Sequence, residues 1–257
     1  MSEKNSVGLF VTCLVDMMRP SVGFAAVKLL EDAGCEVTVP EAQTCCGQPA
    51  YNSGAKKTTI AIAQQVIEAF EGFDYVVAPS GSCAAMISHH YPELLKDDGD
   101  WSRRAGALAL KTFELVSFLT DVRNVDGVEA KFDGSVTYHD SCSGLRELKI
   151  KLQPRKLLKT VKGLEIKEMT DSEVCCGFGG TFCVKYSDIS NEMVSCKTQE
   201  ISNSGADMLL AGDMGCLMNM AGKISREGKN IEVRHVAEIL AGDLSQPAIA
   251  GTERKER

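Results

Sequence analysis

Short apolar runs alternate along the chain with longer segments in which apolar positions recur every three or four residues. The short runs predict strands at residues 7–12, 36–40, 75–78, 135–139, 164–168, 208–211 and 231–234. The longer segments predict helices at residues 21–33, 55–70, 103–120, 154–161, 190–204, 215–226 and 236–240. Regular alternation of strand and helix is typical of an α/β fold with parallel sheets.

The same plan occurs twice. FVTCLVD leads through a helix and a strand to CCG, a long helix and DYVVAPSGSC, and VTYHDSC leads in the same way to CCGFGG and ADMLLAGDMGC. Thirty-one residues separate Cys13 from Cys45, and thirty-two separate Cys142 from Cys175. We therefore predict two homologous parallel-sheet domains, at residues 1–125 and 130–245, followed by a disordered tail at 246–257.

Composition narrows the class of protein. The 257 residues are 44% hydrophobic, enough for a large core, and no apolar run reaches the length of a membrane span. The N-terminus has no signal-peptide pattern, and a formal charge of -7 disfavours binding to nucleic acid or anionic membranes. Eleven cysteines without an export signal indicate a reducing, cytoplasmic environment in which thiols bind metal or do redox chemistry.

The repeated cysteines each follow a predicted strand, at the turn into the next helix. Loops at the carboxyl ends of parallel strands open on the same edge of a sheet, so four thiols distant in sequence can meet there. The residues expected to bind a metal or cofactor are Cys13, Cys45, Cys46 and Cys83 in the first half, and Cys142, Cys175, Cys176 and Cys216 in the second. Cys35 and Cys196 have no counterpart in the other half, and we expect them to be small buried apolar residues.

Four thiolates suit either zinc or an iron-sulfur cluster. Adjacent cysteines direct their sulfurs apart in an extended backbone, which makes them poor joint ligands of one small tetrahedral ion. A multi-iron cluster accepts such a pair more readily, so the spacing favours iron-sulfur, with zinc as the alternative.

The motifs TCLVD, CCGQPA, PSGSCAAM, YHDSC, CCGFGGTF, GDMGCLMN and RHVAEIL resemble a known family. The pattern is similar to the cysteine-rich CCG domains found in heterodisulfide reductase, in the iron-sulfur subunit of glycolate oxidase and in anaerobic glycerol-3-phosphate dehydrogenase. More narrowly, it resembles the lactate utilisation protein A group over residues 7–242. This resemblance implies an oxidoreductase component that helps to oxidise L-lactate, a small 2-hydroxy acid, to pyruvate.

The resemblance also implies partners, namely a ferredoxin-type iron-sulfur subunit and a third small subunit. The chain has no C-x2-C-x2-C-x3-C-P run of its own, so a partner is needed to complete an electron path. The alternatives are a thiol-disulfide redox subunit like that of heterodisulfide reductase, a glycolate oxidase iron-sulfur subunit, and a structural zinc-binding scaffold.

One departure from the resemblance concerns the ligands. The CCG domains of heterodisulfide reductase each have a fifth cysteine for a noncubane [4Fe-4S] cluster, where this chain has Ser80 and Asp213. We therefore expect one or two [4Fe-4S] clusters whose cubane or noncubane geometry stays open. Asp213 is a candidate oxygen ligand, and either residue is also suited to cap the following helix.

Three further residues are candidates for chemistry beyond electron storage, all in the second half. His139 and Asp140 precede Cys142, and a histidine at that point could donate to a sulfur, tune a potential or move a proton. Cys183 follows CCGFGG closely and has no partner in the first half. The glycine-rich CCGFGG lacks G-x-G-x-x-G spacing, so it gives no support for nicotinamide or flavin binding.

Overall fold

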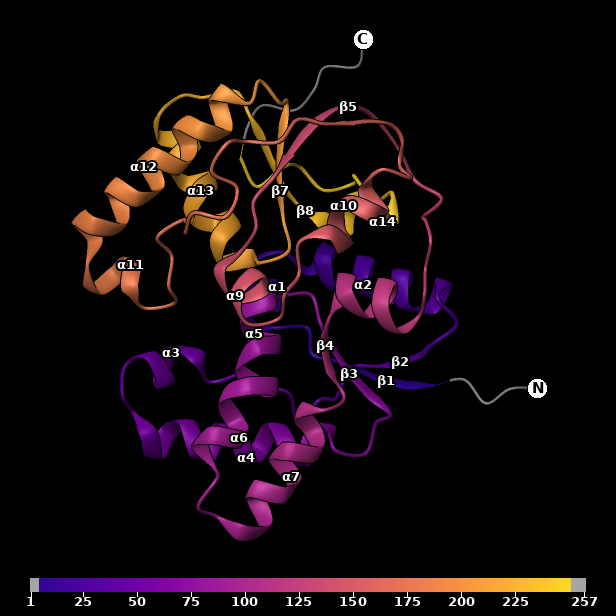
Figure 1. Cartoon of the computed structure of the whole chain (residues 1–257), viewed down its shortest axis with the longest axis vertical. Helices are drawn as coiled ribbons and strands as arrows, with labels where there is room; N and C mark the ends of the chain where they lie inside the picture. The colour runs from indigo at the N-terminus through magenta and orange to yellow at the C-terminus, as the bar shows by residue number, and fades with distance from the viewer. Residues whose placement is uncertain (1–4, 251–257) are drawn as a thin grey trace.

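The computed structural model describes residues 5–250 and contains two four-stranded parallel sheets (Figure 1). The first sheet has the order β2-β1-β3-β4, and the second has the equivalent order β6-β5-β7-β8. The strands are β1 (Ser6–Leu9), β2 (Glu36–Thr38), β3 (Tyr75–Ala78), β4 (Thr112–Glu114), β5 (Lys131–Tyr138), β6 (Lys162–Ile166), β7 (Met208–Ala211) and β8 (Glu232–His235). The predicted α/β class with two homologous parallel-sheet domains is confirmed.

The helices of the first half are α1 (Cys13–Met18), α2 (Pro20–Asp32), α3 (Gln48–Asn52), α4 (Lys56–Phe70), α5 (Gly81–Ala85), α6 (Tyr91–Leu94), α7 (Gly99–Ala109) and α8 (Leu115–Ser117). Two π-helical turns, η1 (Met86–His90) and η2 (Phe118–Val122), continue α5 and α8. The helices of the second half are α9 (Cys142–Arg146), α10 (Leu152–Leu158), α11 (Phe182–Lys185), α12 (Ser187–Asn203), α13 (Met214–Arg226) and α14 (Val236–Ala241).

Both faces of the first sheet are covered, as a buried parallel sheet requires. In β3, Val76 and Val77 are both fully buried but join different clusters, because successive side chains point to opposite faces. Val76 shares its cluster with residues of α4 and α7, whereas Val77 shares its cluster with residues of α2. The cluster that contains Val77 continues into the other half, so the two halves share one core.

The two halves meet in a pseudo-symmetric way. Helix α5 packs against α9 and α1 packs against α13, so the four helices that carry single repeated cysteines lie at the centre of the molecule (Figure 1). Gly81 in α5 and Gly144 in α9 let the backbones approach, since a Cβ on Gly81 would lie 3.0 Å from the Gly144 Cα. Helix α14 of the second half packs on α2 of the first.

Two local expectations are wrong. The predicted helix at 103–120 is interrupted by β4, whose Thr112–Glu114 pairs in parallel with Val76–Ala78. The second half could have indicated this strand, because β8 followed by α14 is the counterpart of β4 followed by α8. Residues 246–250 were expected to start a disordered tail, but the Ile249 amide donates to the Val233 carbonyl at 2.8 Å; residues 251–257 lie outside the described part of the chain.

No helix within residues 5–250 is long and apolar enough to cross a membrane.

Candidate metal centres

The repeated cysteines lie at the carboxyl edge of each sheet, as expected. Cys13 begins α1 after β1, and Cys83 lies in α5 after β3. Cys142 begins α9 after β5, and Cys216 lies in α13 after β7. The two adjacent pairs occupy the loops that follow β2 and β6. Parallel pairing therefore brings each set of four to one place.

In the first half the four sulfurs form a contiguous chain. The thiols of Cys13 and Cys46 lie near enough to Cys45 to lower its pKa, and Cys83 lies near enough to Cys46 to raise the pKa of Cys46. Cys46 and Cys83 are buried, while Cys13 and Cys45 are half-buried. Each centre thus has a closed end and an end nearer to solvent.

The second half repeats this arrangement member by member. Cys142 and Cys176 lie near enough to Cys175 to lower its pKa, and the sulfurs of Cys176 and Cys216 lie within 4.8 Å of one another. Cys176 and Cys216 are buried, while Cys142 and Cys175 are half-buried.

The glycine of CCG has a definite physical role. Gly47 and Gly177 adopt φ values of 83° and 81°, and each backbone amide lies 3.4 Å from the sulfur two residues earlier, on Cys45 and Cys175. A Cβ at Gly177 would lie 2.9 Å from the Ser190 carbonyl oxygen, so a side chain there meets both strain and a clash.

Neighbouring thiols favour negative charge on the first cysteine of each pair. The thiol of Cys13, then that of Cys46, lowers the pKa of Cys45 to about 2. In the same way Cys142, then Cys176, lowers the pKa of Cys175 to about 2. The thiolate is the form of cysteine that binds metal.

The spread of the sulfurs distinguishes between a single ion and a larger group. Two thiolates on one tetrahedral zinc lie about 3.8 Å apart, given Zn–S bonds of about 2.3 Å. Within residues 5–250, the sole set of three His, Cys, Asp or Glu residues whose donor atoms all lie within 4.8 Å of one another is His139, Cys176 and Cys216. The first-half sulfurs therefore fit an extended multi-metal group better than one zinc ion.

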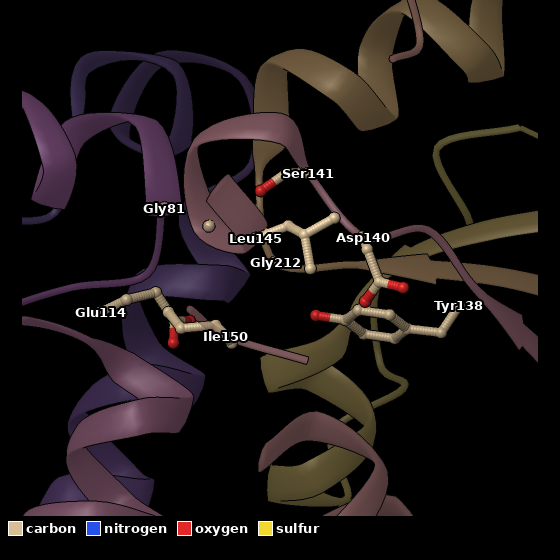
Figure 2. Close-up of a pocket in the computed structure, with 9 residues that line it drawn as sticks. Gly81, Glu114, Tyr138, Asp140, Ser141, Leu145, Ile150 and Gly212 are labelled. Atoms are coloured by element: carbon tan, nitrogen blue, oxygen red, sulfur yellow. The ribbon is translucent and has the colours of Figure 1, made fainter. Parts of the chain in front are cut away.

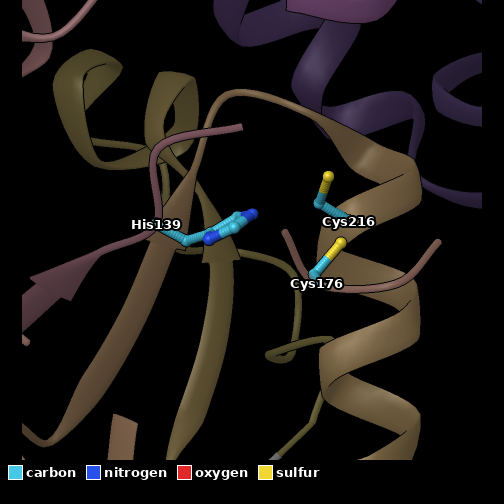
Figure 3. Close-up of side chains that lie close together, drawn as sticks. All are labelled: His139, Cys176 and Cys216. Atoms are coloured by element: carbon cyan, nitrogen blue, oxygen red, sulfur yellow. The ribbon is translucent and has the colours of Figure 1, made fainter. Parts of the chain in front are cut away.

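Figure 3 shows His139 projecting from the end of its strand toward Cys176 and Cys216. Its side chain is fully buried, and burial, then the charge of Lys197, lowers its pKa to about 3. Of the candidates for additional chemistry, His139 is the one that the structure brings to the thiols.

The other two candidates lie differently. Asp140 makes a two-pronged ion pair with Arg155, at 2.8 and 2.9 Å. The Cys183 sulfur lies 3.7 Å from the Gly180 carbonyl oxygen and is half-buried. Catalytic roles for both residues stay predictions.

Ser80 and Asp213 act as helix caps. The Ser80 hydroxyl accepts from the Cys83 amide at 3.4 Å, and Asp213 accepts from the Gly215 amide at 3.2 Å. Asp213 also accepts from the Ser82 amide of the first half at 3.0 Å, so it ties the two halves together beside the thiols. Metal ligation by Asp213 stays a prediction.

The two unrepeated cysteines have different surroundings. Cys35 is buried in the core, as predicted. Cys196 is exposed on α12, so the expectation that it is buried is wrong. It lies on the polar face of that helix, which is turned away from the core.

Anchors of the CCG loops were not recognised from the sequence. The Tyr91 hydroxyl donates to the Cys46 carbonyl at 2.7 Å, and the Asn219 side chain donates to the Cys176 carbonyl at 2.8 Å. In each half a side chain thus fixes the carbonyl of the second cysteine of the pair. The side chains differ between the halves, so comparing the two sequence repeats did not reveal them.

A small pocket lies between the halves, with residues of both facing it (Figure 2). Its volume of about 10 Å³ leaves room for roughly one water molecule. Burial raises the pKa of Glu114, which lines it, to about 7. The pocket is too small for a hydroxy acid.

Comparison with known proteins agrees with this geometry. The family described as CCG, cysteine-rich domain, matches residues 7–88 and 136–221, one copy in each half. The fold and the two thiol sets therefore define a protein with two cysteine-rich CCG domains.

Curated relatives place the chain in a narrower family of CCG-domain proteins. The chain is 50% identical to "Lactate utilization protein A" of Geobacillus sp. (strain WCH70) over 91% of its length and 98% of the relative's. It is 51% identical to the protein of that name in Bacillus pumilus (strain SAFR-032), with the same coverage, and 48% identical to "Lactate utilization protein A 2" of Bacillus cereus (strain Q1) over 93% and 99%. The chain belongs to the lactate utilization protein A family of CCG-domain proteins.

A solved structure supports the fold alone. A hypothetical protein from Helicobacter pylori aligns with a TM-score of 0.65 at 12% identity, covering 98% of this chain and 53% of the other.

Proposed function

We propose that the chain is an iron-sulfur redox subunit of a multi-protein system that oxidises L-lactate to pyruvate. The observation that carries the proposal is the duplicated set of four cysteines at the carboxyl edge of each sheet, each set including one sulfur that faces a backbone amide. The names of the relatives supply the link to lactate.

The proposed ligands are the eight repeated cysteines: Cys13, Cys45, Cys46, Cys83, Cys142, Cys175, Cys176 and Cys216. Their chemistry fits the group, because iron-sulfur clusters are held by cysteine thiolates and the first-half sulfurs are too widely spread for one small ion. An iron-sulfur cluster, when bound, supplies an electron-transfer couple whose potential depends on its charge, hydrogen bonds and exposure.

The chain's own residues prepare this environment. The amides of Gly47 and Gly177 face thiolate sulfurs, so they favour negative charge at the metal ligands. The buried cysteines keep water away from the closed end of each centre, and the half-buried ones leave an end accessible to a partner.

The number of electrons released by lactate oxidation matches the number of proposed metal centres. Oxidation of lactate to pyruvate releases two electrons and two protons, and two one-electron centres together accept both electrons. Ferredoxin-type clusters of a partner subunit would then take the electrons onward, because the chain has no ferredoxin motif. A third small subunit completes the proposed system, which we place in the cytoplasm.

The proposal is tested first by metal content. Protein purified without oxygen should contain iron and acid-labile sulfide, and Cys45→Ser and Cys175→Ser should each lose about half of the iron. Cys196→Ser is the matched control, because that cysteine is exposed and outside both sets; its iron content should not change. Stoichiometric zinc without iron would overturn the proposal in favour of a zinc scaffold.

A second measurement separates redox from structural roles. Lactate-dependent electron transfer, reconstituted with the partner proteins, should fall strongly in Cys45→Ser and Cys175→Ser while circular dichroism still reports a folded chain. Unfolding of the variants would instead support a structural metal clip. Activity with glycolate in place of lactate would reassign the substrate.

A further inference from the structure

The duplication provides an internal comparison for His139. Its backbone amide donates to the Leu210 carbonyl at 2.9 Å, and in the first half the Phe10 amide donates to the Val77 carbonyl at 2.8 Å. Each residue directly follows the first strand of its half and stands three positions before the first repeated cysteine. His139 and Phe10 therefore occupy equivalent places.

The first half shows which side chain fills the equivalent position in an apolar environment. Phe10 is fully buried in the same apolar cluster as Cys46 and Cys83. His139 is also fully buried, beside the equivalent Cys176 and Cys216, but it brings two polar nitrogens into that position. Packing alone is satisfied by phenylalanine, so the histidine requires another explanation.

The imidazole has no hydrogen-bond partner of normal geometry on either ring nitrogen. Burying such a group without a partner is unfavourable, because it loses its hydrogen bonds to water. A neutral imidazole carries a lone pair on one ring nitrogen, and no group of the described residues hydrogen-bonds to either nitrogen. A ring nitrogen and the sulfurs of Cys176 and Cys216 all lie within 4.8 Å of one another.

A second buried position also differs between the two halves. Lys197 is 1% exposed on α12, seven residues after Ser190, which packs against Gly177. Val66 stands at the same interval after Thr59, which packs against Gly47, so the first half has valine where the second has a buried cation. The two halves thus differ in polarity at a second buried position beside the CCG loop.

We propose that His139 supplies a nitrogen donor to the metal centre of the second half, while the centre of the first half has thiolates alone. The inference rests on the proposed function, because it requires metal in the second set of cysteines. It makes the two centres chemically different, since a neutral imidazole adds a donor without adding negative charge.

The test uses nitrogen couplings to the paramagnetic reduced centre. Full-length protein with ¹⁵N-labelled histidine, purified without oxygen, is examined by pulsed electron paramagnetic resonance. We expect a strong ¹⁵N coupling of a directly bound imidazole. Cys45→Ser, which retains the second centre, should keep this coupling, and Cys175→Ser should lose it. Absence of the coupling, or one as weak as that of a hydrogen-bonded amide, overturns the inference.

The variant His139→Phe installs the residue that the first half already accommodates. It should lose the ¹⁵N coupling, although three other histidines remain labelled, and it should leave the first centre unchanged. Retention of the coupling in this variant assigns it to another histidine and also overturns the inference. The couplings in the two cysteine variants decide the question independently if His139→Phe fails to fold. Protein without iron overturns the proposed function itself, whereas two iron centres without nitrogen coupling overturn this inference alone.

Discussion

Glu238 should hold the two halves together, and replacing it with alanine tests this directly. Its carboxylate is fully buried in α14 and accepts hydrogen bonds from the Arg19 guanidinium at 3.0 Å and the Ser21 hydroxyl at 2.7 Å, both in the first half. Its other oxygen accepts from the His235 amide at 3.1 Å and so also caps its own helix. The Arg19 side chain is itself only 10% exposed.

The expected loss follows from these contacts. Removing one member of a buried ion pair costs about 3–5 kcal/mol, because the remaining charge is left without compensation. Glu238→Ala should therefore lower the free energy of unfolding by about that amount. Arg19→Met should also destabilise the chain, because it leaves the buried Glu238 carboxylate without an opposing charge. The double variant should cost less than the sum of the two, because both losses share one interaction.

Urea-induced unfolding followed by circular dichroism measures these differences on identically prepared proteins. The matched control is Asp32→Ala, which removes an ion pair to Lys28 whose side chains are 57% and 61% exposed. An exposed pair contributes about 0–1 kcal/mol, so the control should change little. A loss below about 1 kcal/mol in Glu238→Ala, or additive effects with Arg19→Met, would refute the reasoning.

Three further outcomes are expected. The pKa of Glu114 in the folded chain, about 7, lies above its ordinary value of 4.5. The contribution of the neutral carboxyl to stability is therefore complete below pH 4.5 and is lost as the pH rises through 7. In urea unfolding from pH 4.5 to 8, Glu114→Gln should remove up to about 3 kcal/mol of the change of unfolding free energy with pH. Gly177→Ala should destabilise more than Gly54→Ala in thermal unfolding, because both residues have positive φ but only Gly177 has a neighbour within 4 Å of the added Cβ; equal losses would show that the clash relaxes. Gly81→Ala should cost about 1–3 kcal/mol by forcing α5 away from α9, and an unchanged unfolding midpoint would contradict that close approach.

Elements with strong local signals could be predicted from the sequence. β3 and β7 have the predicted bounds, since each is a short buried run closed by turn residues. The repeat of CCG and its flanking cysteines also indicated that four thiols converge in each half, because carboxyl ends of parallel strands share one edge. The strand β4 was missed, since its three residues lie inside a stretch with helical periodicity and gain their strand character by pairing with β3.

Which side chains meet the thiols depends on tertiary packing. Nothing in the local sequence separates His139, which faces Cys176 and Cys216, from the adjacent Asp140, which pairs with Arg155. The two point to opposite sides of an extended strand end, and the burial of each side depends on helices far away in the sequence. Periodicity encodes the elements and their inner faces, whereas contacts between segments distant in the chain depend on how those elements pack.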